Sequence, residues 1–448
     1  MWHPRLETGR LPLFEQLLAA LRADIAAGRL SPGERLPPQR DLAHSLGVAI
    51  GTVTRAYGEA QRQGLITAHV GRGAFVSTSP VTRDDRLISL NQALPPSTAT
   101  NMLLAETLAR VRRRPDLLDH LAYAPPPGFE SHRRAGAAWV SQALSEVDWR
   151  RLVCCNGAHQ AIALSLAAIE APLILCEAVS YWGLKALAQH TGAALMGLAL
   201  DHQGLTPQAL ERAASETGAR VVYLTPTLQN PTGRVMDLQR RHDIVAVARA
   251  YNLWIIEDDI YALYGKGLNP TPLASLAPER TFYIGGLSKA LAPGLRAGYL
   301  VVPTSEMLDR VVATARALSY APPGLSTLIS TQMIEDGSAL TAAQAVWQEM
   351  AIRTALAMEE LAGIADPPAV PAVLSLWAPM PELAAERLAG QALRAGVELM
   401  APSTPIVTPG LVSGLRISLG APNDHTTLRR ALQIVRAAQG GSLEAGSV

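Results

Sequence analysis

From Leu87 onward, the sequence alternates short apolar runs with longer segments of helical periodicity. Five runs of three or four residues are rich in strand-forming side chains: 152–155, 173–176, 221–224, 254–256 and 282–284. Helix-like segments separate most of them, such as 158–169, 181–190 and 237–251. This order predicts an α/β domain with a mainly parallel sheet covered by helices on both faces. Because ligands of such sheets bind at the carboxyl ends of the strands, the residues after each run are candidates for a functional site.

The length and charge of the chain limit what else it can be. At 448 residues it is too long for one ordinary hydrophobic core, so we expect two or three domains. A hydrophobic content of 48% and a charged content of 17% are typical of a soluble globular protein. The net charge of +1 gives no overall attraction to nucleic acid, so any such contact must come from a local basic patch.

Cysteine, histidine and terminal patterns point to an ordinary intracellular setting. Cys154, Cys155 and Cys176 form no CxxC pair and no disulfide framework, which favours a reducing cytoplasm. Residues 1–5 lack the apolar core of a signal peptide, and no apolar run is long enough to span a bilayer. The ten histidines have no paired metal-binding spacing. We therefore expect a cytoplasmic protein with no membrane partner and no metal site.

The stretch Gly285–Arg296 follows the last of the five runs and holds the most informative lysine. The chain has only three lysines, and Lys185 and Lys266 are expected to be surface charges on a helix and in a loop. Lys289 instead follows a buried strand, where a charged amine is costly and usually functional. A partly desolvated lysine can form a Schiff base with an aldehyde, and Arg296 can hold a phosphate. These two groups together suggest pyridoxal 5′-phosphate.

Two other runs are followed by residues that suit this cofactor. Asn156–Ala161 opens a helix whose free backbone N–H groups could bind a phosphate, although such a turn alone is more often a plain loop. Asp258 comes after the run 254–256 and could either cap a helix or pair with a pyridine nitrogen. In the second role its charge would keep that nitrogen protonated, so that the ring withdraws electrons.

The set Asn230–Gly233, Asp258–Tyr261, Ser288-Lys289 and Arg296 resembles the fold-type I aminotransferases, the aspartate aminotransferase superfamily. The resemblance covers residues 87–437 and implies a pyridoxal-phosphate-binding domain with a small C-terminal subdomain. It implies that Lys289 forms an internal aldimine with the cofactor. It also implies a set of cofactor-binding residues: Asp258 at the pyridine nitrogen, Asn230 and Tyr261 at the ring hydroxyl, Tyr181 stacked on the ring, and the amides of Ala158 and His159 with Ser288 and Arg296 at the phosphate.

Two further residues gain roles only through this resemblance. Tyr123 resembles the tyrosine that reaches the phosphate of the neighbouring subunit, which implies a homodimer. Arg416 resembles the arginine that takes a substrate's α-carboxylate. Considered alone it is an ordinary surface charge, but between apolar strand residues it needs an anionic partner. The family often has serine or threonine three residues before the lysine, where this chain has Gly286.

The first 78 residues have a different pattern. We expect one amphipathic helix over 11–27, a second opened by Pro37 and Pro38 and ended at Gly47, and a third over about 50–63. The segments 64–67 and 71–76 predict a small β-hairpin. Two helices joined by a glycine turn and followed by a hairpin form a winged helix-turn-helix.

This region resembles the winged-helix domain of GntR-type transcription regulators, through the segments Gly28–Pro37, Arg40–Ala43, Gly51–Tyr57 and Gly71–Val76. Residues 1–78 carry nine arginines and six acidic residues, a net charge of +3, which supports DNA binding. The resemblance implies that the third helix enters the major groove. The DNA contacts it implies are Thr52, Thr54 and Arg55 on that helix, Arg40 at a phosphate and Arg72 at the tip of the wing.

A winged helix (1–78) joined by a linker (79–86) to an aminotransferase-like domain resembles the MocR subfamily of GntR regulators. Residues 438–448 are expected to be a disordered tail. The resemblance implies a transcription regulator that binds double-stranded DNA and senses an amino acid or amine through external aldimine formation at Lys289. Two alternatives stay open. One is an active class I/II aminotransferase with an amino acid donor and a 2-oxo acid acceptor. The other is a DNA-binding protein whose second domain only dimerises.

Overall fold

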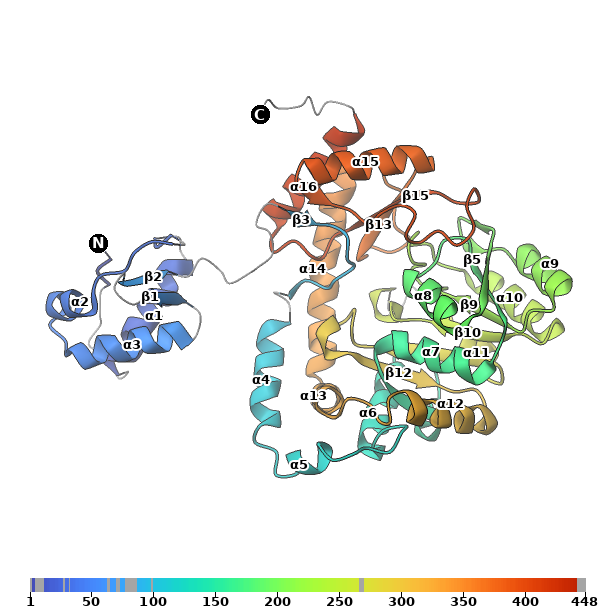
Figure 1. Ribbon diagram of the computed structural model, residues 1–448, viewed down its shortest axis with the longest axis horizontal. Coiled ribbons are helices and arrows are strands. Elements are labelled where there is room, and N and C mark those ends of the chain that lie inside the picture. Colours follow the sequence, from blue (N-terminus) through green and yellow to red (C-terminus); the bar gives the residue numbers. More distant parts are fainter. Residues whose placement is uncertain are drawn as a thin grey trace. The chain divides into compact units, whose positions relative to one another are not determined.

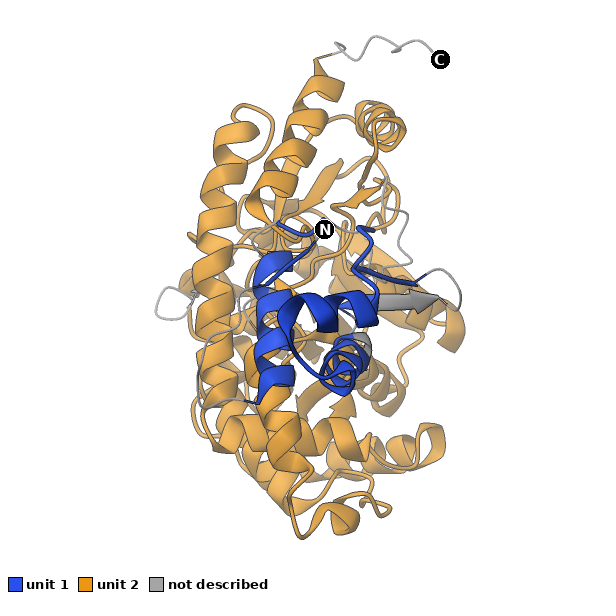
Figure 2. Ribbon diagram, turned by 90° about the vertical axis from the view of Figure 1, so that its left-hand side faces the viewer, with its two compact units in different colours: residues 1–86 blue, residues 87–448 orange. Residues whose placement is uncertain are grey.

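The computed structural model divides the chain into two compact units, residues 1–86 and 87–448, which Figure 2 colours separately. The structure describes residues 2–4, 12–26, 29–31, 33–62, 65–69, 73–76, 87–97, 100–265 and 270–440. The expected linker at 79–86, Arg72 and Lys266 lie outside these residues.

The described part of the first unit holds three helices and a hairpin: α1 (Leu13–Ala26), α2 (Gln39–Leu46), α3 (Ile50–Arg62), β1 (Ile66–His69) and β2 (Gly73–Val76). The two strands pair antiparallel, and α1, α2, α3 and both strands share one apolar core. Gly47 ends α2 in the left-handed conformation, with φ of 65°, which lets the chain turn directly into α3. The predicted winged-helix fold is confirmed.

The second unit is organised around a seven-stranded sheet (Figure 1) with the order β4-β12-β11-β10-β9-β5-β6. Its strands are β4 (Leu152–Asn156), β5 (Leu173–Glu177), β6 (Ala194–Leu198), β9 (Val221–Leu224), β10 (Trp254–Asp258), β11 (Thr281–Gly286) and β12 (Ala297–Val301). Strand β12 runs antiparallel to both of its neighbours, and the remaining neighbours are parallel. The predicted mainly parallel sheet is therefore confirmed, with one reversed strand that the sequence pattern did not reveal.

Helices cover both faces of this sheet because alternate residues of each strand point to opposite faces. Val221 and Tyr223 of β9 pack in one core with helices α7 (Gly157–Ile169), α8 (Trp182–Thr191) and α12 (Ser305–Leu318). Val222 and Leu224 pack in another with α9 (Pro207–Thr217), α10 (Leu238–Ala250) and α11 (Leu273–Leu276). Burial on both faces explains why these strands appear in the sequence as continuous apolar runs.

The remaining elements frame the sheet and build the C-terminal subdomain. Along the chain they are β3 (Ile88–Ser89), α4 (Asn101–Val111), α5 (Leu117–His120), α6 (Glu130–Val140), β7 (Leu200–Asp201), β8 (Gly204–Leu205), α13 (Gly324–Glu335), α14 (Ser338–Glu360), β13 (Ser375–Pro379), α15 (Glu382–Arg394), β14 (Val397–Glu398), β15 (Gly414–Ser418) and α16 (His425–Gln439). In the subdomain, β13 pairs antiparallel with β15, and β14 pairs parallel with β3. Helix α16 extends to Gln439, and Ala438 is buried in the core of the subdomain.

No helix in the described residues is long and apolar enough to cross a membrane. Within the same residues, no group of three or more His, Cys, Asp or Glu side chains is arranged to hold a metal ion.

Candidate functional site

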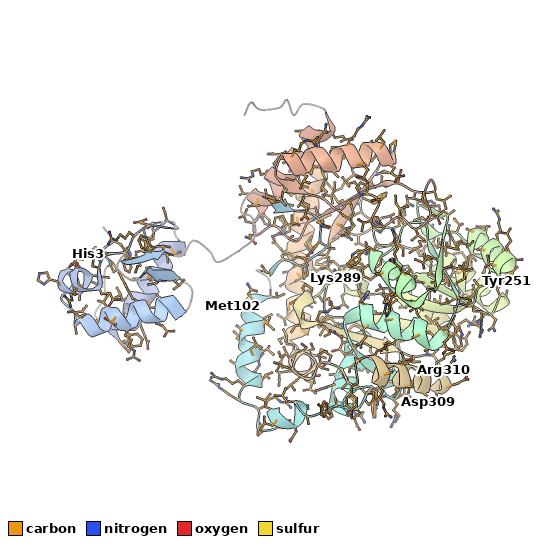
Figure 3. All side chains as sticks on the ribbon, viewed as in Figure 1. His3, Met102, Tyr251, Lys289, Asp309 and Arg310 are labelled. Atoms are coloured by element: carbon orange, nitrogen blue, oxygen red, sulfur yellow. The ribbon has the colours of Figure 1, made fainter. Side chains whose placement is uncertain are left out.

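A cavity of about 850 Å³ lies at the carboxyl ends of β9, β10 and β11, next to the first residues of α7 and α8 and to the C-terminal subdomain. Ten of the predicted site residues line it: Ala158, His159, Tyr181, Asn230, Asp258, Tyr261, Ser288, Lys289, Arg296 and Arg416. Figure 3 labels Lys289, which belongs to the larger unit. Residues that are up to about 260 positions apart in the chain thus meet in one cavity because the strands all end at the same edge of the sheet.

Lys289 follows β11, and its amine is held inside the cavity. Its Nζ donates a hydrogen bond to the carbonyl oxygen of Ala93, at 2.7 Å, and Tyr264 Oη donates to the carbonyl oxygen of Lys289, also at 2.7 Å. Burial, followed by the nearby cation of Arg416, lowers the pKa of Lys289 to about 8. About a tenth of the amine is therefore neutral at pH 7, far more than for an ordinary lysine, and the neutral form is the nucleophile.

Asp258 ends β10 with one carboxylate oxygen satisfied and one free. Tyr223 Oη, on the neighbouring strand β9, donates to Asp258 Oδ2 at 2.7 Å. Asp258 Oδ1 is buried and has no hydrogen-bond partner in the described residues. Burial raises the pKa of Asp258 to about 6. A buried carboxylate oxygen without a donor needs a partner, and a protonated ring nitrogen would be one.

The first turn of α7 and Arg296 form an anion-binding corner. The backbone N–H groups of Ala158 and His159 are at the N-terminus of a 13-residue helix, where the helix dipole favours negative charge. Arg296 Nη2 donates to the carbonyl oxygen of Asn156 at 3.1 Å. A Cβ atom at Gly157 would lie 2.7 Å from Arg296 Nη2, so only glycine lets the guanidinium approach the turn this closely.

Two aromatic rings lie beside this corner. Tyr181 Oη and His159 Nδ1 are 3.4 Å apart, and the rings meet edge to face. Burial and Arg296 lower the pKa of His159, so its ring is neutral at pH 7. The side chain of Tyr181 occupies the space where a Cβ at Gly183 would be, 2.4 Å from ring atoms. Gly183 therefore permits the placement of this tyrosine ring over the cavity.

Arg416 is on β15 and approaches the cavity from the C-terminal subdomain. It is 6% exposed. Its Nη1 donates to Asn230 Oδ1 at 3.0 Å, and its Nη2 donates to the carbonyl oxygen of Asn91 at 2.7 Å. Its Nε is buried without a partner, and no carboxylate in the described residues forms an ion pair with it. A buried guanidinium with only neutral partners is suited to receive an anion.

Close packing explains why position 286 is glycine and not serine or threonine. A Cβ at this position would lie 2.9 Å from the carbonyl oxygen of Ala297 on β12. Serine or threonine would therefore push β11 and β12 apart, and the phosphate corner must rely on other donors.

Tyr123 and Lys185 differ from the residues that meet in the cavity. Tyr123 is 86% exposed, does not line the cavity of its own chain, and packs edge to face against Tyr320 at 5.3 Å.

Lys185 was expected to be a solvated surface charge, and this is wrong. Its Nζ donates to the carbonyl oxygens of Thr404 and Ile406, at 3.2 and 2.8 Å, and so ties α8 to the segment before β15.

The predicted DNA-binding residues of the first unit lie on its surface. Arg40 on α2 is exposed, as are Thr54 and Arg55 on α3, and Thr52 is partly exposed. Thr54 Oγ1 donates to Gln39 Oε1 at 2.8 Å. The guanidinium of Arg55 lies 3.9 Å from the centroid of the Phe14 ring on α1. Arg72 lies outside the described residues.

Comparison with known proteins accounts for both units. Residues 87–435 match the family Aminotransferase class I and II, and residues 13–76 match the family Bacterial regulatory proteins, gntR family. The structure of LysN, an α-aminoadipate aminotransferase from Thermus thermophilus, superposes with a TM-score of 0.71 at 24% identity, over 86% of this chain and 99% of LysN. This likeness confirms the fold-type I architecture.

Two curated regulators are similar to this chain. The "HTH-type pyridoxine biosynthesis transcriptional regulator PdxR" of Corynebacterium glutamicum is 30% identical over 329 residues, 70% of each chain. The "Probable rhizopine catabolism regulatory protein MocR" of Rhizobium meliloti is 26% identical over 328 residues, 65% of this chain and 66% of its own. The chain belongs to the MocR subfamily of GntR-type transcription regulators.

Pyridoxal 5′-phosphate is the cofactor that the MocR family membership and the cavity imply. The residues fit the group on three independent points. The amine of Lys289 can bond to an aldehyde, the free oxygen Asp258 Oδ1 can accept from a ring nitrogen, and the N-terminus of α7 with Arg296 can hold a phosphate. Among these groups, Asp258 Oδ1 is buried without a partner in the described residues, so it needs the donor that a ligand would supply.

Sequence reasoning missed several residues that shape this MocR-type cavity. Asn91 and Ala93 hold Arg416 and Lys289 through backbone carbonyls, which no side-chain pattern reveals. Glu386 and Glu398 also line the cavity from the C-terminal subdomain. Tyr223 could have been noticed, because a hydroxyl in a buried apolar strand needs a partner. In the sheet it pairs with Ile256, two residues before Asp258.

Proposed function

We propose that this chain is a pyridoxal-phosphate-dependent transcription regulator that senses an amino compound at Lys289 and reports it through its DNA-binding unit. One observation carries the proposal. A nucleophilic amine, a phosphate corner, an unpartnered carboxylate oxygen and an unpaired arginine share a single cavity, in a chain that also has a winged helix. The cavity therefore offers sites for the cofactor and for one further anionic group.

Each residue has a definite task around the cofactor, which when bound supplies an aldehyde carbon that an amine can attack. Lys289 provides the covalent attachment. Asp258 holds the proton on the ring nitrogen, and Tyr223 fixes the orientation of its carboxylate. A larger set completes the pocket: Asn230 and Tyr261 at the ring hydroxyl, Tyr181 on the ring face, and Ser288, Arg296 and the amides of Ala158 and His159 at the phosphate.

Arg416 would select the ligand by binding its carboxylate. The guanidinium is already oriented by Asn230 and Asn91, so little side-chain entropy is lost when an anion binds. An amino acid bound there would bring its own amine toward Lys289, displace the lysine from the cofactor and leave the Lys289 amine free. The freed amine can again donate to the carbonyl oxygen of Ala93.

A homodimer would transmit this event. Tyr123 is exposed on its own chain and would reach the cofactor phosphate of the partner subunit. Further apolar side chains are exposed on the same unit, including Leu118, Leu318 and Tyr320. A ligand shifts the balance between two dimer arrangements only by its differential affinity for them. A change in the balance would alter the spacing of the two winged helices on DNA.

On double-stranded DNA, α3 would enter the major groove, with Thr52, Thr54 and Arg55 toward the bases. Arg40 would contact a phosphate, and Arg72 would contact the minor groove or backbone beside the wing. The exposure of Arg40, Thr54 and Arg55 supports this arrangement.

The first test is the visible absorbance of the purified protein with pyridoxal phosphate. Lys289→Ala removes the attachment and should abolish the visible band. Lys185→Arg is the matched control, because it removes a primary amine yet keeps a cation for the carbonyl groups that Lys185 binds. It should retain the band. A band of equal strength in Lys289→Ala would contradict the assignment of Lys289.

The second test adds a panel of amino acids and amines to the cofactor-loaded protein on its operator DNA. At least one compound should shift the band and change the DNase footprint, with no sustained formation of a 2-oxo acid. Footprints that stay the same with every compound and after cofactor removal would exclude the sensing role. Continuous turnover with an amino donor and a 2-oxo acid would instead identify an active aminotransferase.

A further inference from the structure

The cavity that holds Lys289 has a second charged wall, which has no task in cofactor binding. Glu386 on α15 and Glu398 on β14 both line it. The cavity is a ligand site on independent grounds. Asp258 Oδ1 and Arg416 Nε line the same space on side chains that are more than nine-tenths buried, and neither atom has a partner in the described residues.

Glu398 is held in place by neutral donors. Ser89 Oγ donates to Glu398 Oε2 at 2.8 Å, and Asn91 Nδ2 donates to Glu398 Oε1 at 3.3 Å. Asn91 also accepts from Arg416 Nη2 through its carbonyl oxygen, at 2.7 Å. The carboxylate of Glu398 and the guanidinium of Arg416 therefore contact the same residue. A small molecule that binds the guanidinium can reach the carboxylate within the span of one amino acid.

Two acidic side chains of the cavity have no charged partner once the groups of the cofactor and the carboxylate of the ligand are assigned. Arg296 is matched by the cofactor phosphate, Asp258 by the ring nitrogen and Arg416 by a ligand carboxylate. Glu386 and Glu398 are left over, and neither forms an ion pair with any arginine, lysine or histidine in the described residues. A partly buried carboxylate with only neutral donors gains from a cationic partner.

We propose that the effector carries a second cationic group besides its reactive amine and its carboxylate, as basic amino acids such as ornithine and lysine do. This rests on the proposed sensing function and names the chemical class of its ligand. The carboxylate binds Arg416, the α-amine meets the cofactor, and the terminal cation binds Glu398, with Glu386 adding to the negative potential. Trp182 and Leu393 also line the cavity and can pack against the methylene chain. An acidic side chain would instead meet two like charges.

A purely structural role for Glu398 makes a different prediction. If Glu398 only orders Asn91, and through it Arg416, its loss weakens every ligand that has a carboxylate to a similar extent. If it binds the terminal cation, its loss weakens basic amino acids and leaves their neutral isosteres unaffected. The ratio between the two ligand types therefore separates the two roles.

The experiment titrates the cofactor-loaded, full-length protein with L-ornithine and its neutral isostere L-norleucine, with L-lysine and its neutral isostere L-2-aminoheptanoate, and with L-glutamate, and follows the visible absorbance band. In the wild type, ornithine or lysine should bind roughly tenfold or more tightly than its neutral isostere, and glutamate should bind most weakly. Glu398→Gln keeps the hydrogen-bonding shape and removes the charge, so it should abolish most of this preference without weakening the binding of norleucine. Glu386→Gln should reduce it by a smaller factor.

Glu382→Gln is the matched control, because Glu382 begins the same helix, is exposed and does not line the cavity. It should leave every affinity unchanged. Equal binding of norleucine and ornithine by the wild type, or an equal loss for both in Glu398→Gln, would overturn the inference. The proposed sensing function fails differently, with a Lys289-dependent band that no amino compound shifts.

Discussion

The surface of α3 and the cavity around Lys289 are the two regions proposed to bind DNA and the cofactor, and their polar groups are satisfied in different ways. Around Lys289, buried groups such as Asp258 Oδ1 and Arg416 Nε have no partner in the described residues. On the first unit, Thr54 and Arg55 are exposed, and each has a partner within its own domain, Gln39 and Phe14. Water satisfies an exposed polar group at no cost, whereas a buried one needs a partner. A buried polar atom without a partner can therefore indicate a ligand site, whereas an exposed surface that binds DNA shows no such sign.

The same contrast sets the size of the expected effects. Removing a buried charge leaves its partner unpaired in a medium of low polarity, which is costly. Removing an exposed charge costs little because water and salt already screen it. Substitutions in the cavity should thus act strongly and specifically, and substitutions on α3 should act weakly and depend on salt.

The largest effect is expected for Asp258→Asn. Truncating one partner of a buried, hydrogen-bonded charge pair costs about 2–5 kcal/mol, so cofactor affinity should fall by roughly 30- to 5,000-fold. Titration of the cofactor-free protein with pyridoxal phosphate measures this change. Asp259→Asn is the control, because Asp259 is equally buried but accepts from Tyr283 and does not line the cofactor cavity. Similar losses in both variants would mean that the effect reflects general destabilisation.

The next effect is a pH dependence. Burial and Arg416 lower the pKa of Lys289 to about 8, and only the neutral amine attacks an aldehyde. The initial rate at which the cofactor-free protein gains its visible band should therefore rise about tenfold per pH unit below pH 8 and level off above it. A free lysine analogue with an ordinary pKa should continue to rise toward pH 10. Parallel curves for the protein and the analogue would show that the cavity does not activate this lysine.

Arg40→Ala and Arg55→Ala should have smaller effects, measured as DNA affinity against salt concentration. Arg40 is the proposed phosphate contact, so Arg40→Ala should reduce the slope of log K against log salt by about 0.9, because fewer counterions are released. Arg55 is proposed to face the bases, so Arg55→Ala should lower the affinity for the operator more than the affinity for unrelated DNA. Arg29→Ala is the control within the same unit, since Arg29 is already paired with Asp24 at 2.6 Å. A slope that is unchanged in Arg40→Ala, together with an unchanged preference for the operator in Arg55→Ala, would place the DNA on another face.

Much of the cavity could be predicted because its chemistry is encoded locally. Asp258 and Lys289 each come at or shortly after the end of an apolar run, and parallel strands end at a common edge. Arg416 is flanked by Leu415 and Ile417, so the cost of burying it suggested an anionic partner. Local signals of this kind specify which side chains face a ligand.

What the sequence did not reveal depends on contacts between distant segments. The hydrogen bond from Lys289 to Ala93 joins residues 196 positions apart, and that from Arg416 to Asn91 joins residues 325 positions apart. Both use backbone carbonyls, which carry no side-chain signature. Strand β12 (Ala297–Val301) is as apolar as the other strands of the sheet, so composition gave no sign that it runs in the opposite direction. The acidic wall at Glu398 likewise exists only because β14 pairs with β3.

The smallest predicted effect concerns Arg55, and it tests whether contacts within the first unit orient this exposed side chain for DNA binding. The Arg55 guanidinium lies over the Phe14 ring, and an exposed cation–π contact contributes about 0.5–1 kcal/mol. If this contact orients Arg55 for DNA, Phe14→Leu should weaken binding by roughly two- to fivefold. The salt slope should stay unchanged, because no charge is lost. In an Arg55→Ala background Phe14→Leu should have no effect, which a double-mutant cycle measures. An equal loss in both backgrounds would mean that Phe14 acts through packing of α1, and that the α3 surface is not pre-organised for DNA.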